Sequence, residues 1–329
     1  MRSVCLAILF CFLFSTTGAY AAPVTLPQTI TPGFHSTSWD SIDRYTTSTG
    51  APYTGINASG AGFGISDAYG PTGAGDAYDN AYLVFVNGAV FDPGSTVDLT
   101  GTTITAGPVS MSGLNVTVQY YFDTQAALAR IMVFLNNPTA SPINATVDIP
   151  VNFGSDCGTL VQMTSSGDTT FTTADSWIVT SDSNTTPSDA VNTTVLYGPG
   201  GLAPSAVTQT VFNSSDTNGV GATYDVSVPA GETHSLLLFA GLGNITTRGN
   251  TNAGAITGAH LFDTGTNLPR GSLAGLSAAE ISTVLNWQAL QEQPAIAVPT
   301  MTEWGMIIFI VFAGLGSAYY LRRQRRAKN

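Results

Sequence analysis

Residues 22–290 form a series of short apolar and β-branched runs, separated by clusters of Gly, Pro, Asn, Asp and Ser. Runs rich in Val, Ile, Thr, Tyr and Phe that end at turn residues are typical of strands, and helical periodicity is nearly absent. The pattern predicts strands at residues 81–86, 114–122, 129–135, 145–153, 177–180, 223–228 and 233–239. The sequence therefore predicts a mainly β fold, an antiparallel β-sandwich, built as one unit or as two packed lobes that meet near residue 155.

One C-terminal helix is predicted at the end of this stretch. Ser277 and Glu280 have the spacing of a capping box, in which each side chain bonds the backbone N–H of the other residue. Ile281, Val284 and Leu290 follow at helical spacing and give the helix one apolar face. We expect that face to pack on the sandwich.

The charge of the stretch is strongly acidic. Twenty of the 21 acidic residues lie between residues 22 and 297, against four arginines and no lysine, so the net charge there is near −16. Nucleic-acid binding is excluded, because no basic patch is present to neutralise phosphates. A lysine-free, acidic chain rich in Thr, Ser and Gly fits a soluble extracellular domain.

The N-terminus has the pattern of a secretory signal peptide. Arg2 is followed by an apolar run at residues 4–14, and Ala19 and Ala21 occupy the small-residue positions of a cleavage site. We expect residues 1–21 to be removed by cleavage after Ala21, with the following chain outside the cytoplasm.

Removal of the leader also removes Cys5 and Cys11, so the mature chain keeps one cysteine, Cys157. Neither an intramolecular disulfide nor a cysteine-based zinc site is then available. We expect Cys157 to be buried as a small apolar side chain, and the alternative is a thiol available for an intermolecular bond.

The C-terminal tail, residues 298–329, follows a short linker at 291–297 and contains an uncharged span at 306–321. Its sixteen residues would cover roughly 24 Å as a helix, against about 30 Å for a bilayer core, and Trp304, Tyr319 and Tyr320 can extend it at the interfaces. The basic end at 322–329 carries five cations, which are Arg322, Arg323, Arg325, Arg326 and Lys328. By the positive-inside rule this end is cytoplasmic, so the span predicts a transmembrane helix with the bulk of the chain outside.

A polar motif precedes the span at residues 298–305, and its members are Val298, Pro299, Thr300, Met301, Trp304 and Gly305. With the span and the basic end, it resembles the IPTL-CTERM sorting signal of bacterial exosortase systems, with Val298 and Met301 in place of Ile and Leu. The resemblance implies a partner, an exosortase-like membrane protease that cuts near the motif. It also implies that anchoring in the inner membrane is transient.

A glycine-rich segment offers candidate ligands for calcium. Asp67, Asp76, Asp79 and Asn80 lie within fourteen residues and carry the hard oxygen atoms that calcium prefers. Their spacing matches no EF-hand loop, so a solvated, turn-rich loop is the alternative interpretation.

Asp263-Thr264-Gly265-Thr266 resembles the catalytic loop of aspartic proteases. That chemistry needs two carboxylates that share a proton, and the chain has no second Asp-Thr-Gly or Asp-Ser-Gly. We therefore expect Asp263 to accept backbone hydrogen bonds in a turn, and we predict no catalytic residue.

These features lead to one expectation about function and two alternatives. The leading expectation is an exported, non-enzymatic surface or extracellular-matrix protein of structural or adhesive type, with surface polysaccharide as one candidate partner. A calcium- or glycan-binding extracellular module is the first alternative, and a hydrolase is the second. No cofactor other than calcium is expected.

Overall fold

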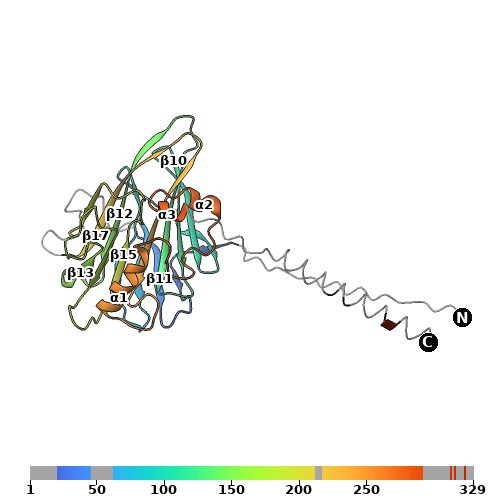
Figure 1. Ribbon diagram of the computed structural model, residues 1–329. Coiled ribbons are helices and arrows are strands. Elements are labelled where there is room, and N and C mark those ends of the chain that lie inside the picture. Colours follow the sequence, from blue (N-terminus) through green and yellow to red (C-terminus); the bar gives the residue numbers. More distant parts are fainter. Residues whose placement is uncertain are drawn as a thin grey trace. The chain divides into compact units, whose positions relative to one another are not determined.

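A computed structural model describes residues 21–45, 62–211 and 217–291, together with the single residues 312, 315, 322 and 323. Contacts divide the chain into two units, residues 1–290 and 291–329. The first unit contains two large antiparallel sheets (Figure 1). The expectation of a mainly antiparallel β fold is therefore confirmed.

The first sheet, sheet A, has nine strands. In spatial order they are β1 (Ala22–Thr25), β8 (Thr96–Thr100), β9 (Thr103–Met111), β10 (Leu114–Phe122), β11 (Leu128–Asn136), β18 (Thr233–Leu242), β15 (Asn192–Val195), β14 (Trp177–Ser181) and β13 (Leu160–Thr164).

The second sheet, sheet B, runs β16 (Ala206–Thr208), β17 (Gly219–Val228), β12 (Ile143–Phe153), β5 (Tyr78–Ala81), β4 (Gly62–Tyr69), β3 (Ser38–Tyr45) and β2 (Gln28–Ile30). A hairpin of β6 (Phe85–Val86) and β7 (Ala89–Val90) joins it by pairing with β12. Both sheets combine strands from either side of residue 155.

The core lies between the sheets and follows from the alternation of side chains along each strand. In β10, for example, Val116, Val118 and Tyr120 are fully buried, whereas the residues between them are half-exposed. Aromatic rings fill the centre: Tyr120 stacks on Phe63 at a centroid distance of 5.1 Å, and its hydroxyl donates to the carbonyl of Tyr82 at 3.0 Å. The buried hydroxyl is thus satisfied inside an apolar layer.

The outer face of sheet A carries a second apolar cluster, which the C-terminal part of the unit covers (Figure 1, orange to red). The covering elements are α1 (Asn252–Ala259), the 3₁₀ turn η2 (His260–Phe262), α2 (Ala278–Ser282) and α3 (Gln288–Gln291). Phe262 and Trp287 pack on Phe239 of β18 at centroid distances of 5.1 and 5.5 Å. The cover allows β14, β15 and most of β11 and β18 to be buried on both faces.

Arg130 on β11 is almost fully buried, and it bonds the covering segment to the sheet. Its Nη1 donates to the carbonyls of Ser272 (3.1 Å) and Ala274 (2.8 Å), and its guanidinium lies 4.7 Å from the ring centroid of Tyr121. Burial lowers the pKa of Arg130 to about 10 and raises the pKa of its buried neighbour Asp123 to about 6. The side chain therefore stays charged at neutral pH and provides donors that the covering loop needs.

Six of the predicted strands correspond to β10, β11, β12, β14, β17 and β18, but the prediction of one strand at residues 81–86 is wrong. Strand β5 ends at Ala81 and β6 begins at Phe85. Tyr82 between them has a φ of +59°, a left-handed conformation outside the β region that regular strand residues occupy.

The helix prediction is confirmed at its start and wrong in its extent. Ser277 and Glu280 form the capping box, but α2 ends at Ser282. Beyond it the chain pairs with β18, where the N–H of Leu285 donates to the carbonyl of Ser235 at 2.9 Å. Helix α1 was not predicted, because its sequence of Gly, Ala and Thr has no apolar stripe; its N-cap, Thr251, accepts from Gly254 N.

The N-terminal leader before Ala21, the motif at 298–305 and most of the predicted span lie outside the described residues. Within the positions that are described, no helix has the length and apolar character needed to cross a membrane.

Substitution of Asn286 tests whether buried hydrogen bonds stabilise the C-terminal cover on sheet A. The Nδ2 of Asn286 donates to the carbonyls of Leu196 and Leu237, both at 2.7 Å, and its Oδ1 accepts from Leu237 N at 2.8 Å. Tyr224 and Trp287 also donate to the carbonyls of Leu196 and Leu237, so Asn286→Ala leaves one buried group, Leu237 N–H, unpaired. We expect the variant to lower the free energy of unfolding by about 1–3 kcal/mol in guanidinium denaturation.

The matched control for this test is Asn115→Ala on the outer face of sheet A. Asn115 is half-buried, and its side chain makes no hydrogen bond within the described part of the chain. The control should change stability by less than about 0.5 kcal/mol. Equal losses in the two variants would contradict a special role for Asn286.

Candidate functional site

A row of polar side chains crosses the outer face of sheet B, where β12 pairs with β17. The register places Asn144 opposite Ser227 and Thr146 opposite Asp225. Because side chains alternate along strands, their neighbours Ala145 and Val226 turn inward and are buried. The two strands thus present two adjacent polar pairs to solvent.

The hairpin of β6 and β7 adds a wall to this surface. Asn87 and Gly88 form its two-residue turn, both with positive φ, as Asn-Gly turns between antiparallel strands do. Asn87 Oδ1 accepts from Thr146 N at 2.9 Å, and Asn87 N donates to Thr146 O at 2.8 Å. The turn is therefore fixed to the edge of β12 by two hydrogen bonds.

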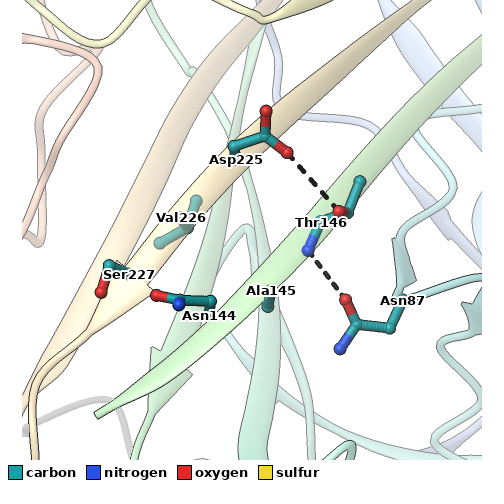
Figure 2. A pocket seen from close by; sticks show the side chains of 7 residues that line it. All are labelled: Asn87, Asn144, Ala145, Thr146, Asp225, Val226 and Ser227. Carbon is teal, nitrogen blue, oxygen red and sulfur yellow. Dashed lines mark hydrogen bonds between the residues drawn. The ribbon is translucent and has the colours of Figure 1, made fainter.

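Together these elements line an open hollow of about 380 Å³ on the surface of the sheet, which we call the polar groove (Figure 2). Its lining consists of Asn87, Asn144, Ala145, Thr146, Asp225, Val226 and Ser227. Figure 2 shows Asn144 and Ser227 side by side and Asp225 directed toward Thr146, whose hydroxyl lies 3.5 Å from Asp225 Oδ1. The volume is within the ~300–1,000 Å³ range of small-ligand sites.

The charge of the polar groove comes from Asp225, since its lining includes no basic residue. Next to the groove on the same two strands, Asp148 is buried and accepts from the Thr223 hydroxyl at 2.6 Å. The exposed surface therefore offers amide, hydroxyl and carboxylate groups, which hydrogen-bond to uncharged polar ligands.

Sequence reasoning did not identify the polar groove. The signals were present: Asn87-Gly88 between two apolar pairs predicts a tight hairpin, and polar residues alternate with apolar ones at 143–148 and 223–228. The pairing of β12 with β17 joins residues about eighty positions apart, and this pairing was the missing information.

The four calcium candidates lie on and before neighbouring strands at one end of sheet B. Asp67 is on β4, Asp79 and Asn80 are on β5, and Asp76 lies just before β5. Asp67 Oδ1 is already engaged by two backbone N–H groups, those of Ala68 (2.6 Å) and Ala77 (3.0 Å). Asn80 is buried, whereas Asp76 and Asp79 are exposed.

The electrostatics show that these carboxylates are close to one another. Although Asp79 is exposed as a residue, partial burial of its carboxylate raises its pKa to about 6, with further contributions from Asp156, Asp76 and Asp67. Burial also raises the pKa of Asp67, and Asp76 adds to that shift. Asp156 thus belongs to the same group of carboxylates, which we call the acidic end, although it lies about eighty positions further along the chain. Among the described residues, no three His, Cys, Asp or Glu side chains are arranged to hold a metal ion.

Asp263 bonds side chains rather than the backbone of a turn, so that expectation was wrong. Its Oδ1 accepts from Trp177 Nε1 at 2.7 Å, and its Oδ2 lies 2.7 Å from His260 Nδ1. Oδ1 therefore holds the end of η2 against β14, whereas Oδ2 bonds within the η2 segment itself. The ring of His260 meets Trp177 edge-on at 5.1 Å, which extends the same contact.

Cys157 is exposed, so the expectation that it is buried is also wrong. It lies in the short 3₁₀ turn η1 (Asp156–Gly158), where the chain leaves β12 and turns toward β13. None of the residues of this turn is buried, because the turn crosses the end of the sandwich rather than its interior.

Comparisons with known proteins give little further information. The sequence matches no family model and no curated protein. Among solved structures, the chain is similar to a polysaccharide lyase (11% identity, TM-score 0.35), covering 60% of this chain and 32% of the lyase. It is also similar to a protein named as a kojibiose phosphorylase from the human microbiome (10%, 0.41), covering 74% of this chain and 35% of the other.

A third similar structure is a galactose mutarotase related enzyme from Lactobacillus acidophilus (8% identity, TM-score 0.29), covering 57% of this chain and 93% of that one. The chain therefore spans about a third of the length of the first two structures. At these scores the similarities carry no argument about activity.

The raised pKa of Asp79 predicts how the stability of the protein depends on pH. The pKa of Asp79 is raised to about 6 in the folded protein, above its ordinary value of 3.8, so its contribution favours the folded state at low pH and is lost as pH rises from about 4 to above 6. Asp79→Asn should therefore raise the melting temperature at pH 7.5 and raise it much less at pH 4.5.

The measurement is thermal unfolding of both proteins at the two pH values. Asp98→Asn on β8 of sheet A serves as the control, since it removes one exposed charge from the other sheet. If Asp79→Asn and Asp98→Asn behaved alike at both pH values, the repulsion inferred at the acidic end would be refuted.

Proposed function

We propose that the protein is exported and acts as a non-enzymatic cell-surface or extracellular-matrix protein of structural or adhesive type. We also propose that an exosortase-like membrane protease processes its C-terminal tail, with the inner membrane as a transient anchor. The observation that carries this proposal is the order of motif, uncharged span and basic end at residues 298–305, 306–321 and 322–329.

Two further features support export and a surface role. The leader at residues 1–21 would direct the chain across the membrane, and the lysine-free stretch that follows carries the charge of a soluble extracellular domain. In the described unit, a large inter-sheet core supports β12 and β17, whose outward side chains are mostly polar, which suits a rigid scaffold that presents a surface.

The sorting proposal predicts the behaviour of tail variants in the native host. Pro299→Ala and Trp304→Ala should each leave a longer, membrane-retained form, because each removes a residue that matches the sorting motif. Immunoblots of membrane and extracellular fractions would measure the two forms.

Thr302→Ala is the matched control, because it changes a variable position inside the same motif. This variant should be processed as the unchanged protein is. Normal processing of both Pro299→Ala and Trp304→Ala would refute the sorting role.

A calcium-binding module is the second candidate. It rests on the electrostatic influence of Asp67, Asp76 and Asp156 on Asp79, since no three carboxylates of the described residues are arranged to hold a metal ion. If calcium binds at the acidic end, it should raise the melting temperature at pH 7.5 and do so less at pH 5, where Asp79 is largely protonated. Titration calorimetry with calcium chloride would measure binding directly. The absence of both heat and a thermal shift would remove this candidate.

A hydrolase centred on Asp263 is the third and weakest candidate. Both of its carboxylate oxygens are engaged, by Trp177 and by His260, so its geometry supports an anchoring role.

A further inference from the structure

We propose that the polar groove over β12 and β17 binds the sugar residues of an uncharged polysaccharide. This inference rests on the proposed adhesive function and names its ligand class. Its basis is the combination of a hollow, a lining of amide and hydroxyl groups, and a rigid backbone beneath them.

The first step is the hydrogen-bonding capacity of the lining. Within the described part of the chain, the side chains of Asn144 and Ser227 make no hydrogen bond, and Asn87 uses its Oδ1 but not its Nδ2. These groups include donors and acceptors in close proximity (Figure 2). A sugar hydroxyl both donates and accepts, so adjacent hydroxyls match this mixed set better than a purely donating or purely accepting ligand would.

The second step is charge. Asp225 is the ionisable residue of the lining, and it lies on a stretch with a net charge near −16. An acidic polysaccharide would be repelled both locally and over the longer range. A carboxylate accepts hydrogen bonds from neutral hydroxyls, and such bonds are stronger than those between uncharged groups. The polar groove therefore favours uncharged over acidic sugar chains.

The third step is pre-organisation. Asn144, Thr146, Asp225 and Ser227 stand on paired strands, and Asn87 is fixed to Thr146 by two backbone-involving bonds of 2.9 and 2.8 Å. Binding then costs little ordering of the protein. Because the lining has no aromatic ring, a single groove should bind weakly, with a Kd of about 1 mM, and many copies on one surface would bind a polymer through avidity.

The experiment is affinity gel electrophoresis of the full chain in a mild detergent, with dextran, mannan or galactan in the gel and polygalacturonate as the acidic comparison. We expect retardation by at least one of the uncharged polymers and none by polygalacturonate. Asn144→Ala, Ser227→Ala and Asp225→Ala should each weaken the retardation about five- to tenfold, since each removes a hydrogen-bonding group.

Two control variants test whether a loss of polymer binding is specific to the side chains of the polar groove. Asp225→Asn keeps an oxygen acceptor and should retain more binding than Asp225→Ala. Thr117→Ala changes a polar residue on a strand of sheet A, on its outer face. This variant should bind the polymer as the unchanged protein does. Thermal unfolding of every variant checks that the fold is intact.

Three outcomes would overturn the proposal: no retardation by any of the uncharged polymers, stronger retardation by polygalacturonate, or equal effects of Thr117→Ala and the groove variants. Tail processing is measured on the same cultures. Normal export and processing without polysaccharide binding would refute the groove and leave the sorting proposal standing, whereas the reverse result would refute sorting alone.

Discussion

Burial of apolar side chains between two antiparallel sheets is the constraint on which the rest of the structure depends. Each strand of the sandwich must direct every second side chain into the core, as Val116, Val118 and Tyr120 do in β10. The side chains between them point away from the core and need not be apolar. Polar residues such as Thr146 and Asp225 can therefore gather on the outer face of sheet B at no cost to the core.

Sheet A has a further requirement, because several of its strands are buried on both faces. Phe239 and its neighbours need a cover, and the chain after β18 provides one through Phe262 and Trp287. The polar groups beneath that cover are bonded to backbone, as Arg130 and Asn286 are, since an unpaired polar group there would be destabilising. The cover is thus held by a small number of buried hydrogen bonds as well as by packing.

Structural polar residues differ from candidates for ligand binding in whether the fold already satisfies their hydrogen-bonding groups. Asp263 engages both of its oxygens within the fold, and Asp67 already accepts two backbone bonds. Asn144 and Ser227, in contrast, are exposed and have hydrogen-bonding capacity left in the described structure. Motif resemblance pointed to Asp263 and residue type pointed to Asp67, whereas the geometry points to Asn144 and Ser227.

The sequence by itself determined the β class, most of the long strands, the capping box of Ser277 and Glu280, and the acidic, lysine-free character of the domain, because alternation, capping and charge are local properties. Its leader and sorting tail remain predictions. Tertiary structure alone decided the exposure of Cys157, the partners of Asp263 and the break at Tyr82. It also decided the polar groove, because strand pairing brings together residues that are about eighty positions apart, and no local pattern encodes which strands will be neighbours.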